Sequence, residues 1–204
     1  MQFAKTHIYH VYNRGNNSQT LFFSRENYLF FLKKIKTCIL PYADILAWCL
    51  MPNHFHLMVY VNEVELEISP ENEQMGQYNR LIKKRLLNDS ISVMLRSYTR
   101  AIQKQNNMTG SLFQHRTKAV CLSEINGITP AWFQSKYCTT INITDPEKEY
   151  PQVCFNYIHQ NPVRSGLVKT PSAWEFSSYP DYCGIRNGKL INRERTAELG
   201  LSWI

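Results

Sequence analysis

The stretch DILAWCLMPNHFHLMVYV (residues 44–61) holds two short apolar runs on either side of Pro52-Asn53. Runs of this length, rich in β-branched and aromatic side chains, are typical of strands, and proline with asparagine is typical of a turn. We therefore expect a β-hairpin. Because side chains alternate along a strand, His54 and His56 are predicted to share one face. The other face is then formed by Phe55, Leu57, Val59 and Val61.

The segments around the hairpin predict two further strands and a helix. Residues 7–12 (HIYHVY) are aromatic and β-branched and run into a cluster of turn formers, which is typical of a strand and a loop. Ser24 can cap a helix whose apolar residues recur at helical spacing until Pro41. Residues 116–122 (RTKAVCL) are predicted to form the last strand of the set.

The remaining segments are predicted from charge and helix-breaking residues. Five glutamates make residues 62–73 a solvated connection, and the basic segment after it predicts two helices split at Asn88-Asp89-Ser90. A later helix is predicted from Pro151 to about Gln160, because proline is favoured in a first turn and Asn161-Pro162 should stop the helix.

This order of elements predicts an α+β fold. Strand, helix, strand, strand, helix, strand describes a ferredoxin-like (split βαβ) antiparallel sheet with helices on one face. The late helix, which carries Tyr157, is predicted as an addition at the C-terminal side of that unit.

Composition favours a polyanionic partner. The net charge is +7, and each phosphate neutralised by Lys or Arg releases counterions. No secretory signal or membrane-length apolar run is found, and the six cysteines form no C-x-x-C pair. We expect a cytoplasmic protein with reduced thiols and no membrane association.

Candidate metal ligands come from two segments. Two imidazoles at i and i+2 on a strand, His54 and His56, can converge on one ion, although a short H-x-H motif also arises by chance. Tyr157 and Asn161 lie four apart and so share a helical face, where an amide oxygen could complete a three-ligand site. Imidazole with amide ligation suits Mn²⁺, Mg²⁺ or Zn²⁺. Asn161 could equally be a helix stop, and Tyr157 could be a core residue.

Five colinear stretches resemble the REP-associated tyrosine transposases, which belong to the HUH superfamily of single-tyrosine transposases. They are YHVYNRGNNSQTLFF (9–23), WCLMPNHFHLMVY (48–60), GSLFQHR (110–116), YIHQNPVRSGLV (157–168) and WEFSSY (174–179). The pairing of MPNHFHL with YIHQNPVRSG is far more specific than either motif alone.

The resemblance implies a site and a reaction. His54, His56 and Asn161 would bind a divalent metal ion, Mg²⁺ or Mn²⁺, and Tyr157 would be the nucleophile. The implied activity is metal-dependent cleavage of single-stranded DNA next to hairpins such as repetitive extragenic palindromes. Attack by Tyr157 gives a 5′-phosphotyrosine, which another 3′-hydroxyl can reverse to join strands, so no organic cofactor is needed.

Several assignments stay open. His159 and Gln160 compete with Asn161 as third ligand, at spacings from Tyr157 that fit the superfamily less well, and His159 is a candidate base for the phenol. Tyr98 is a rival nucleophile, but it lies on an apolar helical stripe and no amide follows it by four residues.

Candidate DNA contacts are basic or polar side chains. Two lie in the loop after the first strand and could read the foot of a hairpin. The full set is Asn13, Arg14, Arg80, Lys83, Lys84, Arg85, Arg96, Arg100 and Arg116.

Domain organisation follows from the same resemblance. Residues 1–170 are predicted to form the HUH nuclease domain, with a C-terminal tail, 171–204, packing on it. Residues 123–146 exceed what compact relatives carry and are a possible insertion. The chain could act as a monomer or a homodimer.

Three other functions fit parts of the pattern. The first is a domesticated, non-cleaving protein that binds hairpin DNA. The second is a metal hydrolase whose nucleophile is water, with Tyr157 structural. The third is an RNA-binding module on a ferredoxin-like sheet, although the sequence lacks an RNP-type aromatic motif.

Overall fold

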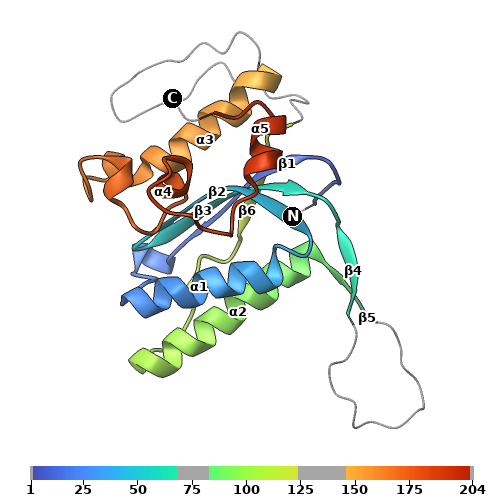
Figure 1. Ribbon diagram of the computed structural model, residues 1–204. Helices are drawn as coiled ribbons and strands as arrows, with labels where there is room; N and C mark the ends of the chain where they lie inside the picture. Colours follow the sequence, from blue (N-terminus) through green and yellow to red (C-terminus); the bar gives the residue numbers. More distant parts are fainter. Residues whose placement is uncertain (1, 69–82, 124–145, 203–204) are drawn as a thin grey trace.

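A four-stranded antiparallel sheet forms the centre of the molecule (Figure 1). The computed structural model describes residues 2–68, 83–123 and 146–202. The strands are β1 (Ile8–Arg14), β2 (Ala43–Met51), β3 (His54–Val61) and β6 (Lys118–Cys121), in the order β2-β3-β1-β6. Every neighbouring pair is antiparallel. With a helix between β1 and β2 and another before β6, this is the predicted ferredoxin-like order, which is confirmed.

Two helices cover one face of the sheet, α1 (Arg25–Cys38) and α2 (Leu87–Asn106) (Figure 1). Helix α1 begins after Ser24 as predicted, and the Asn27 side-chain oxygen accepts hydrogen bonds from the backbone N–H groups of Phe23 and Ser24. The larger hydrophobic core lies between these helices and the sheet. The predicted inner face of β3 is buried there, namely Phe55, Leu57, Val59 and Val61.

The other face of the sheet is covered by α3 (Pro146–Arg164) and by the C-terminal segment (Figure 1). That segment contains η2 (Pro171–Ala173), α4 (Tyr179–Tyr182) and α5 (Arg193–Glu198). Its backbone pairs with β2, where the N–H of Ser178 donates to the carbonyl of Trp48 at 2.9 Å and that of Asn192 to Ile45 at 2.9 Å. The described part of residues 171–204 thus packs on the same sheet as the rest of the chain.

Two short strands form a separate two-stranded ribbon where the sequence predicted a solvated connection and the start of a helix. β4 (Glu65–Ile68) lies within the expected solvated connection, and β5 (Lys83–Leu86) lies where a helix was expected. The two strands pair antiparallel, and across them Lys84 Nζ lies 2.9 Å from Glu65 Oε1. Asn88-Asp89-Ser90 does not separate two helices, because α2 begins at Leu87 and these residues form its first turn, where Asp is favourable.

Helix α3 extends further at both ends than predicted. It begins at Pro146 rather than at Pro151, and it continues through Asn161-Pro162 to Arg164. The prediction that Pro162 stops the helix is wrong, since proline removes one N–H donor but its fixed φ angle is helical. Asn161 therefore stays on the helix. Of the predicted insertion, residues 124–145 lie outside the described part of the chain.

A search of the described residues for a membrane-crossing helix, by length and apolarity, finds none.

Candidate active site

The hairpin of β2 and β3 presents two histidines toward α3. Alternation along β3 places His54 and His56 on the face opposite the larger core, and Met58 of the same face is buried against α3. In the register with β1, His54 pairs with Arg14 and His56 with Tyr12. The histidines therefore lie where β3 starts, beside the end of β1.

Helix α3 brings Tyr157 and Asn161 over the same place. The helix is held to the sheet by Cys154, Phe155 and Ile158, all buried in the smaller core. Tyr157 and Asn161 are one turn apart and face the histidines. The rings of His56 and Tyr157 are 5.4 Å apart, centre to centre.

The Asn161 amide joins the two imidazoles. Its oxygen lies 3.3 Å from Nε2 of His54, and its nitrogen lies 3.2 Å from Nε2 of His56. His56 and Asn161 are only 5% and 6% exposed. Strand β3 and helix α3, about a hundred residues apart in the chain, thus bring the two Nε2 atoms and the two amide atoms together where little water reaches them.

The other ring nitrogens fix the tautomers. His54 Nδ1 lies 2.7 Å from Asn53 Oδ1, which can only accept, so the proton of His54 lies on Nδ1 and its Nε2 carries a lone pair. Burial lowers the pKa of His54 and holds the pKa of His56 well below its usual value, which favours the neutral rings. A lone pair of His54 therefore faces the Asn161 oxygen.

His10 is part of this arrangement, and the sequence reasoning missed it. Its Nε2 lies 2.9 Å from Nδ1 of His56, and burial lowers the pKa of His10 to about 4. A neutral His10 can accept the Nδ1 proton of His56, which leaves the Nε2 of His56 free to accept from the Asn161 amide. The sequence signal was the alternation of His10 with Tyr12 on β1, but only the register with β3 places them beside His56.

These residues fit a divalent ion. Two imidazole nitrogens and an amide oxygen can point at one centre, and each imidazole is oriented by a partner on its other nitrogen, as is usual for metal-binding histidines. Within the described residues, no group of three or more His, Cys, Asp or Glu could hold a metal. Among the residues that the structure describes, the Asn161 amide is the group beside both imidazoles whose oxygen could serve as a third ligand.

A pocket of about 360 Å³ opens over the site. We call it the histidine pocket. The described residues that line it are aromatic, basic or polar, and none of them is acidic: Tyr12, Asn13, Arg14, His54, His56, Gln114, Arg116, Lys118 and Tyr157. Such a lining can accept a nucleotide, with cations for phosphate and ring faces for bases.

Tyr157 is partly buried at one wall of the histidine pocket. Burial raises the pKa of its phenol, while a hydrogen bond from the Asn161 side chain and the charge of Arg164 oppose that rise. The Arg164 guanidinium lies 5.4 Å from the centre of the Tyr157 ring. The helix thus supplies the phenol with two groups that favour its ionised form.

The competing residues lie elsewhere. His159 is fully buried on the other side of α3, where its Nε2 is 2.8 Å from the Ser178 hydroxyl and its ring contacts Phe155, so it faces neither Tyr157 nor the histidine pair. Tyr98 is buried between α1 and α2 and donates its hydroxyl to the carbonyl of Leu21 at 2.7 Å. Neither is placed to act with Tyr157.

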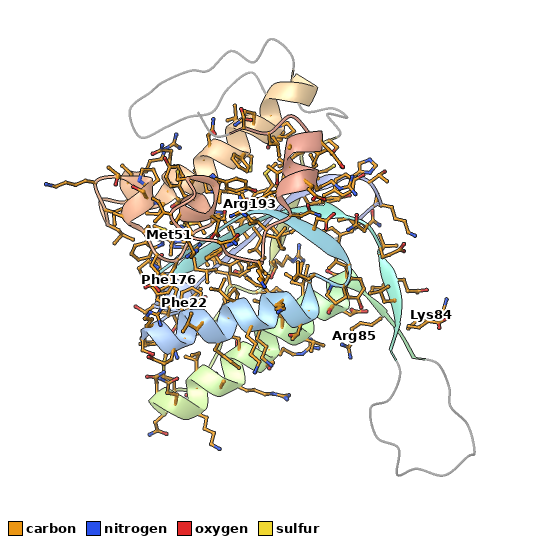
Figure 2. All side chains as sticks on the ribbon, in the orientation of Figure 1. Phe22, Met51, Lys84, Arg85, Phe176 and Arg193 are labelled. Carbon is orange, nitrogen blue, oxygen red and sulfur yellow. The ribbon has the colours of Figure 1, made fainter. Side chains whose placement is uncertain are left out.

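The predicted DNA contacts lie in different parts of the structure. Arg14, Arg116 and Asn13 all line the histidine pocket, but the Asn13 side chain is buried and its amide already donates to Gln114 and Thr117. Arg96 and Arg100 are exposed on α2. Lys84 and Arg85 lie on the β4–β5 ribbon, well away from α3 (Figure 2). Arg80 and the side chain of Lys83 lie outside the described residues.

The chain combines a split βαβ sheet with a histidine pair at the start of a central strand and a helix on the same face that carries Tyr157, and it shares its fold with a solved tyrosine transposase. The chain is similar in structure to a REP-associated tyrosine transposase bound to a REP hairpin. The likeness covers 100% of this chain and 88% of that one, with a TM-score of 0.55 and 17% sequence identity. Comparisons with protein-family models and with curated proteins give no match.

Proposed function

We propose that the protein is a metal-dependent nuclease and strand transferase that cuts single-stranded DNA next to a hairpin. The observation that carries the proposal is the meeting of Tyr157, His54 and His56 at one pocket, with Asn161 beside both imidazoles and no acidic side chain among the described lining residues. The similar fold of a transposase bound to a REP hairpin supports hairpin DNA as the substrate.

In the proposed reaction, the Tyr157 oxygen attacks the scissile phosphorus. A bond from phosphorus to that oxygen forms, the bond from phosphorus to the 3′-oxygen breaks, and the phenol proton is ultimately passed to the released 3′-hydroxyl. The 5′-phosphotyrosine keeps the energy of the bond, so attack by another 3′-hydroxyl can rejoin strands. Arg164 and the Asn161 hydrogen bond assist by favouring loss of the phenol proton.

The metal would be held by His54, His56 and Asn161, and Mg²⁺ or Mn²⁺ is the proposed ion. When bound, it would supply charge stabilisation to the phosphoryl oxygens and orient the phosphate. Arg14, Arg116 and Lys118 surround the same pocket and can contact flanking phosphates.

The test is a covalent trap. A DNA hairpin with a single-stranded flank is labelled at its 3′ or 5′ end and incubated with protein and Mg²⁺ or Mn²⁺. On a denaturing gel, the 3′ label is expected to move with the protein, while the 5′ label appears on a shortened strand with an extendable 3′-hydroxyl. Tyr157→Phe and His56→Ala should abolish the adduct. Tyr150→Phe, on the same helix, is the matched control and should retain it.

Two results would contradict the proposal. Cleavage by Tyr157→Phe without an adduct would make water the nucleophile. Tight hairpin binding by the folded wild-type protein, with no cleavage in either metal, would make it a non-cleaving DNA-binding protein.

A further inference from the structure

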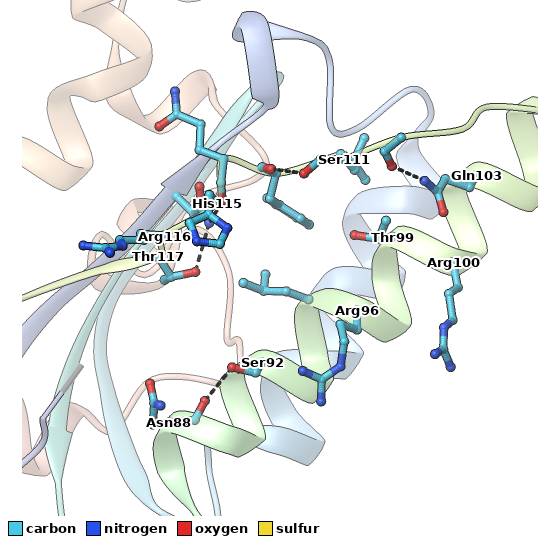
Figure 3. A pocket seen from close by; sticks show the side chains of 16 residues that line it. Asn88, Ser92, Arg96, Thr99, Arg100, Gln103, Ser111, His115, Arg116 and Thr117 are labelled. Carbon is cyan, nitrogen blue, oxygen red and sulfur yellow. Dashed lines mark hydrogen bonds between the residues drawn. The ribbon is translucent and has the colours of Figure 1, made fainter.

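A second and larger groove adjoins the histidine pocket. It has a volume of about 750 Å³ and lies between α2 and residues 110–117, and we call it the α2 groove. Figure 3 shows Arg96, Thr99, Arg100 and Gln103 on α2, with Ser111, His115 and Arg116 on the facing segment. Asn13, at the end of β1, and Gln114 and Arg116 line both cavities, so these residues form a wall that the two share.

The shared wall is held in place by hydrogen bonds. The Asn13 amide donates to the Gln114 carbonyl at 3.2 Å and to the Thr117 hydroxyl at 2.9 Å. The Gln19 amide donates to the carbonyls of Ser111 and Leu112 at 2.8 and 2.9 Å. The α2 groove therefore has a fixed shape before any ligand binds, which lowers the entropic cost of binding.

The α2 groove carries positive charge from arginines that no carboxylate of the described residues neutralises through an ion pair. None of the described residues that line it is acidic. Arg96, Arg100 and Arg116 are exposed and make no ion pair within the described part of the chain, whereas Arg25, Arg186 and Arg195 elsewhere are each paired with a carboxylate. These unpaired guanidinium groups suit an anionic ligand.

The remaining lining suits a sugar–phosphate backbone rather than bases. Thr99 offers a hydroxyl and Gln103 the second N–H of an amide that also donates to the Gly110 carbonyl, and both are donors of the kind that contact phosphates. The Phe113 ring, the one Phe, Tyr or Trp among the described lining residues, is only 6% exposed and offers no ring face, although single-strand binding relies on such faces for base stacking. The histidine pocket differs, since Tyr12 and Tyr157 line it.

We propose that the α2 groove binds the phosphate backbone of the duplex stem of a DNA hairpin whose single-stranded flank lies in the histidine pocket. This rests on the proposed function. From Ser92 to Gln103, α2 rises about 16 Å, close to the length of about five base pairs. Arg116, on the shared wall, lies at the junction between stem and flank.

Binding measurements in EDTA, where no cleavage occurs, test this separately from catalysis. Fluorescence anisotropy compares a hairpin bearing a single-stranded flank with the same flank lacking the stem. In Arg96→Gln/Arg100→Gln, hairpin affinity at 0.15 M salt should fall about 30-fold, and the slope of log affinity against log salt should fall by about 2. Affinity for the stemless flank should change less than about twofold.

Lys104→Gln is the matched control, because Lys104 is exposed on the same helix but does not line the α2 groove. It should leave the hairpin affinity and the salt slope nearly unchanged, and a thermal melt should show that all variants are folded. Equal losses on both ligands, or no loss on the hairpin, would overturn the stem assignment. A stem-dependent loss in a protein that forms no phosphotyrosine adduct would leave the α2 groove standing and contradict only the proposed reaction.

Discussion

The side-chain oxygen of Asn161 lies 3.3 Å from Nε2 of His54, and Asn53 holds the His54 proton on the opposite nitrogen. Two atoms that carry lone pairs therefore face each other in a nearly dry location. A cation between them would turn this contact into a favourable one, which makes Asn161 the residue that distinguishes a metal site from a hydrogen-bonded cluster.

Replacing Asn161 should change metal affinity in a direction set by the new side chain. Asn161→Ala removes an oxygen ligand and should weaken Mn²⁺ binding by about tenfold or more, whereas Asn161→Asp keeps an oxygen and adds negative charge, so it should bind at least as tightly. Calorimetric titration measures both. Asn156→Ala, on the same helix, is the control. Unchanged affinity in Asn161→Ala would remove this residue from the ligand set.

His10 is expected to act as a positioning residue for His56. His10→Ala leaves the Nδ1 proton of His56 without its acceptor, and loss of such a partner typically weakens metal binding about 10- to 100-fold. His10→Gln offers an amide oxygen and should recover part of the affinity. His115→Ala serves as a control for loss of an exposed histidine. If His10→Ala and the wild type bind Mn²⁺ equally, the orientation of His56 does not depend on His10.

Arg164 should assist ionisation of the Tyr157 phenol. Its positive charge opposes the rise in the pKa of Tyr157 that burial causes. Arg164 is exposed, so solvent screens the effect, and Arg164→Gln should slow adduct formation about two- to fivefold. Because the phenol pKa rises in this variant, the rate should recover at higher pH. Arg164→Lys keeps the charge and should retain most of the rate. A loss of rate that is the same at every pH would contradict a role through the pKa.

The stability of the metal-free protein should fall as the solution is acidified. Burial lowers the pKa of His159 to about 3 and that of His10 to about 4, while both titrate near 6.5 in the unfolded chain. Protons therefore bind the unfolded chain first, and the free energy of unfolding decreases as pH falls from about 6.5 toward about 4. Each buried histidine contributes a slope of up to about 1.4 kcal/mol per pH unit.

Urea unfolding in EDTA at several pH values between 4.5 and 7.5 measures this slope. His159→Gln should have a shallower dependence than the wild type, whatever its stability at pH 7.5. His115→Gln, which alters an exposed side chain, should keep the wild-type slope. A parallel dependence in His159→Gln and the wild type would show that His159 is protonated in the folded state.

The local pattern of residues in the sequence was sufficient to predict the sheet and the faces to which its side chains point. Alternation in residues 54–61 predicts that His54 and His56 share a face, and the four-residue spacing of Tyr157 and Asn161 predicts that they share a helical face. Such relationships depend on backbone geometry within one element. The sequence also contains the split βαβ order, because each element has its own periodicity and its own turn residues.

Relationships between distant elements were decided by the tertiary structure. His10 meets His56 only because Tyr12 pairs with His56 across the sheet, and register is a long-range property. The β4–β5 ribbon forms through pairing between Glu and Lys strands whose local charge pattern also fits a helix. Helix α3, which contacts β2, continues past Pro162, and the α2 groove lies where Asn13 and Gln19 donate hydrogen bonds to residues of the segment 110–117. Hydrogen bonds and packing between segments far apart in the chain leave no periodicity in the sequence from which they could be predicted.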